Sequence, residues 1–325
     1  MFHLIEPQLG RISGGLRYNH AVVDAADGSI QRHELPGAWP NPTDEDVLAL
    51  QGLLAQLDAP VLLDGLIGCA LPSPVKSPVP IVQLVHALAE TPATQQREGA
   101  CLQGADAVVA TSRFAAAELY RRYGLEVTVA SPGVQPRPLA TGDNGGHFIC
   151  VGGVEPNKNQ LFLAEVLTQL YASGVGGWRC TIAGPLNDPQ YATQVRQQLA
   201  QLPTKCSTIT GELDEHALAA LYDSADLLLL PSQAETFGLV VREATAAGIP
   251  SLVSAGTGAE EALDAGLALE LTKTVWVDAL QHWLTDQRHR HQLQTEAQMA
   301  RQHLTYGWRA TAETILGVLA TVDSV

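Results

Sequence analysis

Short apolar runs alternate with longer amphipathic segments from one end of the chain to the other. The run Leu227 to Leu230 has the length of a strand and ends at Pro231, whereas Trp308 to Val322 carries its apolar residues at helical spacing. This alternation is typical of βα units, in which helices cover both faces of a parallel sheet. The sequence therefore predicts an α/β protein.

The length of the chain favours two domains. Its 325 residues exceed the usual size of one domain, and a hydrophobic content of 46% can support more than one core. A turn-rich stretch without periodicity occupies residues 133–146. We therefore expect a first Rossmann-like domain over residues 1–138, a second over 139–306, and a C-terminal helix in 307–325 that packs back toward the first domain.

Strands are expected where the apolar runs are short, with helices between them. In the first domain they are predicted over residues 2–6, 29–35, 61–66, 81–86, 107–111 and 126–130. In the second domain they are predicted over residues 148–151, 179–183, 207–210, 225–231 and 249–254. The repeated pattern predicts two doubly wound parallel sheets.

Charge and composition exclude several classes of partner. The formal net charge of −15 disfavours binding to nucleic acid or to anionic membrane surfaces, because proteins that bind either usually carry a clustered basic face. No apolar run approaches the roughly 20 residues that cross a bilayer. Five scattered cysteines without a CxxC pair support neither a disulfide framework nor a zinc site. The N-terminus carries no secretion signal, so we expect a cytoplasmic protein.

The most informative stretch runs from Pro231 to Pro250 and reads PSQAETFGLVVREATAAGIP. It predicts a strand end, a loop and a helix in succession. Gly238 permits close approach of the backbone to a ligand, and a helix starting near Leu239 offers unpaired N–H groups and the positive end of its dipole. The stretch therefore predicts an anion site.

Two carboxylates frame this site. Glu235 lies in the loop before the helix, and Glu243 lies a little over one turn inside it. Carboxylates accept hydrogen bonds from hydroxyl-rich ligands, so the pair suits the two ends of a nucleotide sugar. The alternative is that both are solvated acids at a helix start, where acidic residues are common.

This stretch resembles the family 4 retaining glycosyltransferases. Their hallmark is two glutamates separated by seven residues around a Phe-Gly-aliphatic core, followed by a Gly-x-Pro strand entry. The resemblance implies the GT-B fold, two Rossmann-like domains facing a cleft. It also implies metal-independent transfer of a hexose from a nucleoside-diphosphate sugar to a small-molecule or glycan hydroxyl, with no cofactor beyond that donor.

The resemblance also implies roles for individual residues. Glu235 would contact the donor sugar hydroxyls beside the reacting carbon, and Glu243 would hold the ribose hydroxyls. The start of the helix would bind the diphosphate. The donor-binding residues expected there are Phe237, Gly238, Leu239 and Val240.

A second resemblance covers Phe148 to Asn159, which is similar to the opening strand and loop of the second domain in that family. There a Gly-Arg pair is followed by a lysine, and Lys158 would grip the diphosphate as a point charge. This chain departs from the pattern at Gly153, where the family usually has arginine. One phosphate-neutralising group is missing, and Lys158 as an ordinary exposed lysine is the alternative.

The segment Gly10 to Tyr18 follows the first predicted strand and opens a helix. Its glycines do not match the dinucleotide fingerprint G-x-G-x-x-G, because Gly14 and Gly15 are adjacent. It does resemble the Gly-Gly loop of the transferase family. That resemblance would place Gly15 under the distal phosphate, with a plain turn as the alternative.

His86 ends a predicted strand, at the carboxyl edge where open α/β sheets bind ligands. A single histidine there is more often structural. In many family members, however, a histidine at this position points at the donor sugar and acceptor, so the resemblance makes His86 a candidate catalytic residue beside Glu235. Asp64 is a weaker candidate for the acceptor site.

Two alternatives to this function remain open from the sequence. One is a non-catalytic nucleotide-sugar-binding protein on a decayed transferase scaffold, which the departure at Gly153 makes plausible. The other is transfer onto a sugar phosphate. The acidic first half disfavours an anionic acceptor, although Arg11, Arg17 and Arg113 keep it open. The donor base, the sugar and the acceptor are not determined by the sequence.

Overall fold

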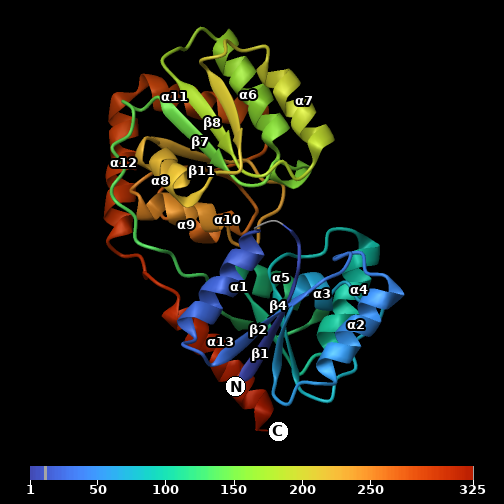
Figure 1. The fold of residues 1–325 in the computed structure, drawn as a ribbon. Helices are drawn as coiled ribbons and strands as arrows, with labels where there is room; N and C mark the ends of the chain where they lie inside the picture. Colours follow the sequence, from blue (N-terminus) through green and yellow to red (C-terminus); the bar gives the residue numbers. More distant parts are fainter. Residues whose placement is uncertain (11–12, 325) are drawn as a thin grey trace. The chain divides into compact units, whose positions relative to one another are not determined.

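The structure, a computed structural model, describes residues 1–10 and 13–324, so Arg11 lies outside the described residues. The chain divides into two compact units (Figure 1). The first comprises Met1–Gly133 together with Gly307–Val325, and the second comprises Val134–Tyr306. The C-terminal helix α13 (Arg309–Asp323) is therefore part of the first unit. None of the described helices is both long and apolar enough to span a membrane.

The first unit contains one parallel sheet with the strand order β2-β1-β3-β4-β5-β6. Its strands are β1 (Phe2–Pro7), β2 (Ile30–Leu35), β3 (Val61–Asp64), β4 (Ile81–Val85), β5 (Ala107–Ala110) and β6 (Thr128–Val129). The helices between them are α1 (Gly14–Ala25), α2 (Asp44–Leu54), α3 (Gly65–Gly68), α4 (Pro92–Gln103) and α5 (Arg113–Tyr123). The strand order reverses between β1 and β3, and ligands of open α/β sheets bind at such reversals.

The second unit contains another parallel sheet, with the order β12-β11-β10-β7-β8-β9. Its strands are β7 (His147–Val151), β8 (Arg179–Ala183), β9 (Ser207–Gly211), β10 (Leu227–Leu230), β11 (Ser251–Ser254) and β12 (Gly266–Leu269). Its helices are η1 (Pro156–Lys158), α6 (Gln160–Ala172), α7 (Pro189–Leu199), α8 (Glu215–Asp223), α9 (Leu239–Ala246), α10 (Ala259–Ala262), α11 (Lys273–Thr285) and α12 (Gln287–Arg301). Counted within the unit, this is the Rossmann order 3-2-1-4-5-6, with its reversal between β7 and β10.

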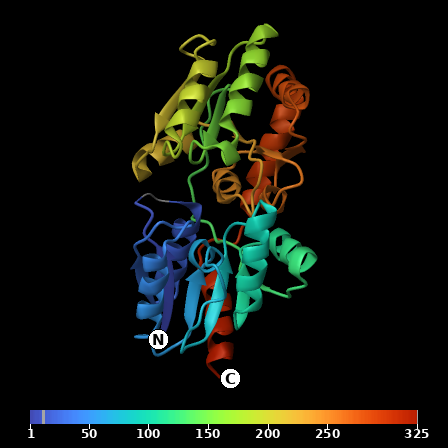
Figure 2. The ribbon, with the colours of Figure 1, turned by 90° about the vertical axis from the view of Figure 1, so that its right-hand side faces the viewer.

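The central strand β10 explains how an uninterrupted apolar run serves two cores. Its four leucines are all buried. Leu227 and Leu229 join the core formed with α6, α7 and α11, while Leu228 and Leu230 join the core formed with α8, α9 and α10. Side chains alternate between the faces of a strand, so a strand covered on both faces must be apolar at every position. Figure 2 shows helices on both faces of this sheet.

The predicted α/β class and the two doubly wound parallel sheets are confirmed. One strand was not expected from the sequence. The edge strand β12 reads Gly-Leu-Ala-Leu and is only partly buried. It pairs in parallel with β11 on a single side. Such a short segment has too little periodicity to predict a strand.

Candidate active site

Two loops meet at the strand reversal of the second unit. One follows β7 and carries Lys158, and the other follows β10 and carries Glu235. Because β7 and β10 are hydrogen-bonded neighbours in a parallel sheet, both loops leave from the same edge. The topology therefore brings together two residues that lie 77 positions apart in the sequence.

Lys158 and Glu235 form an ion pair. The Nζ atom lies 2.5 Å from Oε1 of the carboxylate, and the Ser232 hydroxyl donates a second hydrogen bond to the same oxygen at 2.8 Å. Burial works to lower the pKa of Lys158, but the charge of Glu235 and its hydrogen bond outweigh burial, so this pKa is raised. Lys158 is therefore a cation held at the edge of the sheet.

The loop that carries Glu235 is held through its backbone at Ala234 and at Glu235 itself. Asn157 binds the loop's backbone in two places: its side-chain amide donates to the Ala234 carbonyl at 3.1 Å, and its Oδ1 accepts from the Ala234 N–H at 3.0 Å. On the other side, the Gly258 N–H donates to the Glu235 carbonyl at 2.8 Å. These contacts define the position of Glu235 without a contribution from its own side chain.

Helix α9 begins directly after this loop. Its N-cap is Gly238, whose φ of 84° lies in the left-handed region that favours glycine. No side chain among the described residues caps this end, so the first N–H groups, beginning at Leu239 and Val240, are available to an anion. Phe237 is 4% exposed and its ring packs in the core, so only its backbone can face a ligand.

Glu243 lies inside α9 and is buried. Its Oε2 accepts a hydrogen bond from the Tyr222 hydroxyl at 2.8 Å, and the Arg137 guanidinium lies 3.5 Å from the same oxygen. All three residues belong to the second unit. The second glutamate of the motif is thus supported by a phenol and a cation.

The departure at Gly153 has a local structural counterpart. A β-carbon built at Gly153 would overlap the amide nitrogen of Asn187. That nitrogen donates a hydrogen bond to the Glu155 carboxylate at 2.7 Å. The space into which a side chain at residue 153 would extend is therefore filled by Asn187.

We expect Gly153→Arg alone to weaken binding of a nucleoside diphosphate or leave it unchanged, because the new side chain must displace Asn187 from Glu155. The double variant Gly153→Arg/Asn187→Ala removes the overlap and adds a cation, so it should bind about tenfold more tightly than the wild type. Isothermal titration calorimetry with UDP, GDP and ADP measures this, with Asn187→Ala as the control. Equal affinity of the single and double variants would contradict the coupling.

In the first unit a buried cluster forms at the carboxyl edge of β3 and β4. The Asn19 amide nitrogen donates to Oδ2 of Asp64 at 2.8 Å, and the Asn19 Oδ1 lies 2.8 Å from Nε2 of His86. The other Asp64 oxygen accepts the Leu66 N–H at 2.8 Å and caps α3. Asn19 is fully buried and Asp64 is 1% exposed, so Asp64 supports the cluster from below the surface.

These contacts determine which nitrogen of His86 carries the proton. The Asp64 carboxylate can only accept, so Asn19 must turn its amide nitrogen toward it and its oxygen toward His86. An oxygen requires a donor, so Nε2 of His86 is protonated. Burial lowers the pKa of His86, although Asp64 and Glu6 act to raise it. The neutral ring therefore has Nδ1 as its basic nitrogen.

Gly15 lies against this histidine. A β-carbon at Gly15 would approach the His86 ring to 3.2 Å, closer than most side chains tolerate. The Tyr18 ring meets His86 edge-on, with 5.0 Å between the ring centroids. Three residues that the sequence singled out separately, Gly15, Asp64 and His86, are thus brought together in one cluster.

The lowered pKa of His86 has a consequence for stability. The unfolded chain binds a proton near pH 6.5, whereas folded His86 does so only at a lower pH. The contribution of His86 to the free energy of unfolding is complete above pH 6.5 and is lost as the pH falls through the pKa of the folded state. We expect the melting-temperature gap between wild type and His86→Gln to shrink from pH 7.5 to 5. A gap for His86→Gln that stays constant over this pH range would contradict the expectation.

The family follows from comparison with known proteins. The family model described as glycosyl transferases group 1 matches residues 135–299, slightly more than half of the chain. The chain belongs to the group 1 glycosyl transferases. As a glycosyltransferase it is an enzyme, which sets aside the non-catalytic alternative.

Curated relatives of this glycosyltransferase include the D-inositol 3-phosphate glycosyltransferase 1 of Catenulispora acidiphila, 26% identical over 295 residues. That alignment covers 76% of this chain and 69% of the relative. The D-inositol 3-phosphate glycosyltransferase of an Arthrobacter species is 27% identical over 279 residues, with 75% and 66% covered. The chain thus spans about two thirds of the length of these relatives.

Solved structures with the same fold include a sucrose-phosphate synthase from Thermosynechococcus elongatus, with a TM-score of 0.79, 19% identity and 99% of both chains covered. Anabaena HepE in complex with UDP and glucose has a TM-score of 0.77 at 14% identity, with 98% of this chain and 99% of HepE covered. The predicted GT-B fold is confirmed.

The sequence missed the residues that support those of the glycosyltransferase motifs. Among them are the following: Asn19, Arg137, Asn157, Asn187, Tyr222 and Ser232. Ser232 donates to Glu235 only three positions away, whereas each of the others acts through a contact with a residue distant in the sequence, as with Asn19 and His86. Asparagine is common in turns for local reasons, so its presence carries no signal of such a role.

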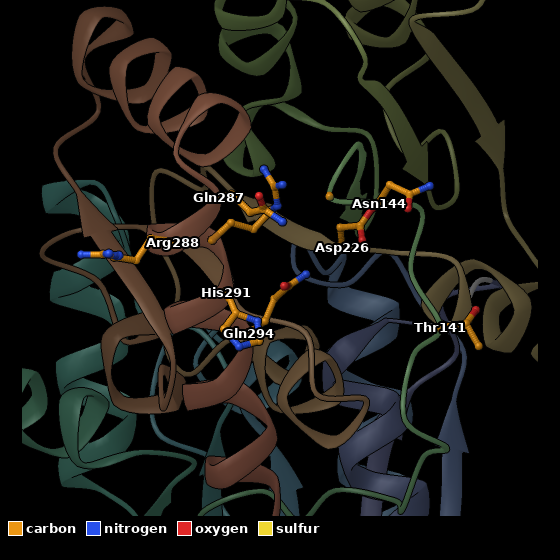
Figure 3. Close-up of a pocket in the computed structure, with 9 residues that line it drawn as sticks. Thr141, Asn144, Asp226, Gln287, Arg288, His291 and Gln294 are labelled. Atoms are coloured by element: carbon orange, nitrogen blue, oxygen red, sulfur yellow. The ribbon is translucent and has the colours of Figure 1, made fainter.

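A polar hollow of about 890 Å³ lies elsewhere on the second unit of the glycosyltransferase. Figure 3 shows residues of α12 such as His291 on one side, with Asn144 and Asp226 on the other. Asp226 directly precedes β10 and Asn144 precedes β7, so this hollow lies at the amino edge of the sheet. The motif residues lie at the carboxyl edge, where α/β proteins bind their ligands.

Proposed function

We propose that this glycosyltransferase is a retaining, metal-independent member of family 4. It transfers a hexose from a nucleoside-diphosphate sugar to a hydroxyl acceptor. The observation that carries the proposal is the pairing of Lys158 with Glu235 beside the start of α9, where a cation, a carboxylate and helix N–H groups converge. A nucleotide sugar offers the matching chemistry, a diphosphate next to a ring of hydroxyls.

In this proposal the second unit binds the donor. Lys158 and the first N–H groups of α9 bind the diphosphate, Glu235 accepts hydrogen bonds from the sugar hydroxyls, and Glu243 accepts from the ribose. Asn187 occupies the space of the absent arginine at Gly153. The charge of the diphosphate is therefore neutralised by Lys158 and by the N–H groups at the start of α9. HepE, which has a similar fold, is described with UDP and glucose, so UDP is the first nucleotide to test.

The proposed chemistry needs no covalent intermediate. The bond between the anomeric carbon and the diphosphate oxygen breaks while the acceptor oxygen bonds to the same face of that carbon. The acceptor's hydroxyl proton passes to the departing phosphate oxygen. Lys158 and the N–H groups of α9 stabilise the charge that develops on the leaving group. His86, whose basic nitrogen is Nδ1, stays a candidate catalytic residue, as the family resemblance implies.

A phosphorylated acceptor is a second candidate. The relatives named D-inositol 3-phosphate glycosyltransferases support it. Arg17 and Arg113 belong to the first unit and supply cations, and Arg11 lies outside the described residues. A carboxylate as buried as Asp64 has little surface to offer an acceptor, and its acceptor role stays a prediction.

The test is a screen of UDP-, GDP- and ADP-hexoses by thermal shift, since a true donor stabilises the folded state by preferential binding. The donor that binds is then incubated with neutral polyols or inositol phosphates, with and without EDTA, and the product anomer is assigned by NMR. Retention in the presence of EDTA is expected. A product with inverted anomeric configuration would reject the retaining mechanism, and loss of activity in EDTA would reject metal independence. The absence of a thermal shift with every nucleotide sugar would reject donor binding.

A further inference from the structure

Glu243 is held on one side by two groups that the sequence motif does not contain. The Tyr222 hydroxyl donates to Oε2 at 2.8 Å, and Tyr222 is 1% exposed. The Arg137 guanidinium lies 3.5 Å from the same oxygen and also stacks over the Tyr222 ring, 4.2 Å from its centroid. Tyrosine and arginine thus form one assembly around a single carboxylate oxygen.

The assembly is tied to the helix that bears Glu243. The Arg301 guanidinium donates to the Arg137 carbonyl at 2.6 Å and to the Ala246 carbonyl at 2.7 Å. Ala246 is the last residue of α9. The backbone of Arg137 is therefore bound to the same helix as its partner Glu243, which keeps the cation in register with the carboxylate.

A carboxylate held by one oxygen cannot rotate freely. Without Tyr222 and Arg137, the Glu243 side chain would have several rotamers and would lose entropy on binding a ligand. With its Oε2 engaged by two donors, the plane of the carboxylate is set before the ligand arrives. Preorganisation of this kind strengthens a hydrogen bond to a hydroxyl.

We propose that Tyr222 and Arg137 are positioning residues that orient Glu243 toward the ribose hydroxyls and so make the site selective for ribonucleotides over 2′-deoxyribonucleotides. This inference rests on the proposed donor site in the second unit. It assigns no contact with the ligand to either residue. Their effect is confined to the part of the ligand that Glu243 reads.

The experiment compares a nucleoside diphosphate with its 2′-deoxy analogue by calorimetry. The probe is whichever of UDP, GDP and ADP binds the wild type most tightly. We expect the wild type to prefer the ribonucleotide by about tenfold, the usual worth of a hydrogen bond to a charged group. Tyr222→Phe, which keeps the ring under Arg137, should reduce that preference to about twofold while binding the deoxy analogue as well as the wild type does.

Two further variants complete the design. Arg137→Gln removes the cation and should lower the same preference, which keeps the test decisive if Tyr222→Phe folds poorly. Tyr171→Phe removes an exposed hydroxyl at the end of α6 and should change nothing. If Tyr222 and Arg137 had a purely structural role, their replacement would weaken binding of both nucleotides equally and leave the ratio of the two affinities unchanged.

The outcomes separate the two levels of the proposal. If the wild type prefers the ribonucleotide and both Tyr222→Phe and Arg137→Gln keep that preference, the positioning role is overturned and the donor site stands. If the wild type binds the two nucleotides equally, Glu243 does not read the ribose and the inference is overturned with that assignment. If the wild type binds none of the three nucleoside diphosphates, the donor site itself is rejected and the inference with it.

Discussion

Replacing Glu235 by glutamine is expected to lower the rate of sugar transfer at least about a hundredfold, the effect of removing one group that stabilises a transition state. Glutamine keeps the size of the side chain but loses the charge that pairs with Lys158. Since Lys158 is then free to interact with the diphosphate alone, affinity for the nucleoside diphosphate should not fall. Transfer rates and calorimetry on the same preparation measure the two effects.

Two other variants show whether the effect is specific to Glu235. Glu243→Gln should do the reverse and weaken nucleotide binding, because it changes the proposed ribose contact. Glu296→Gln makes the same charge change at an exposed position of α12 and should leave both quantities unchanged. The assignment of separate roles to the two glutamates fails if Glu235→Gln and Glu243→Gln lose equal nucleotide affinity.

Gly258→Ala is expected to have a comparable effect from outside the motif. A β-carbon there would overlap the backbone carbonyl of Thr236 and approach that of Glu235 to 2.8 Å. Backbone atoms cannot turn aside as a flexible side chain does, so the loop that carries Glu235 must move. A displacement of about 1 Å at a reacting group can cost about a hundredfold in rate, so kcat should fall by that order.

The matched control is Gly176→Ala, where the added β-carbon meets nothing within 4 Å. Both glycines have ordinary backbone angles, so the two variants differ in steric contact and not in backbone strain. Circular dichroism and melting curves establish that each variant is folded before kcat is measured. Wild-type kcat in Gly258→Ala would show that transfer tolerates displacement of the loop and does not depend on the position of Glu235.

Much of the fold was predictable because it depends on local periodicity. The leucine run at β10 indicates a strand covered on both faces, and the structure buries all four leucines. The edge strand β12 was missed because partial burial leaves a short segment without a distinctive pattern. Its pairing with β11 is a tertiary contact, which the local sequence does not encode.

The motif residues were also predictable, but their partners were not. Glu235, Glu243 and Lys158 stand out because spacing and residue type are local properties of the chain. That Lys158 meets Glu235 follows from the adjacency of β7 and β10, which is a property of sheet order. The support that Tyr222 and Arg137 give to Glu243 has no counterpart in any short segment.

The sequence by itself determined the α/β class and the repetition of doubly wound sheets, and it predicted the segment from Pro231 to Pro250 as the place of the chemistry. Only the tertiary structure decided that Asn187 fills the space of the absent side chain at Gly153, and that Asn19 sets the protonated nitrogen of His86. The physical reason is range. Periodicity and helix capping act between residues a few positions apart, whereas a hydrogen bond between buried side chains exists only after the strands have packed.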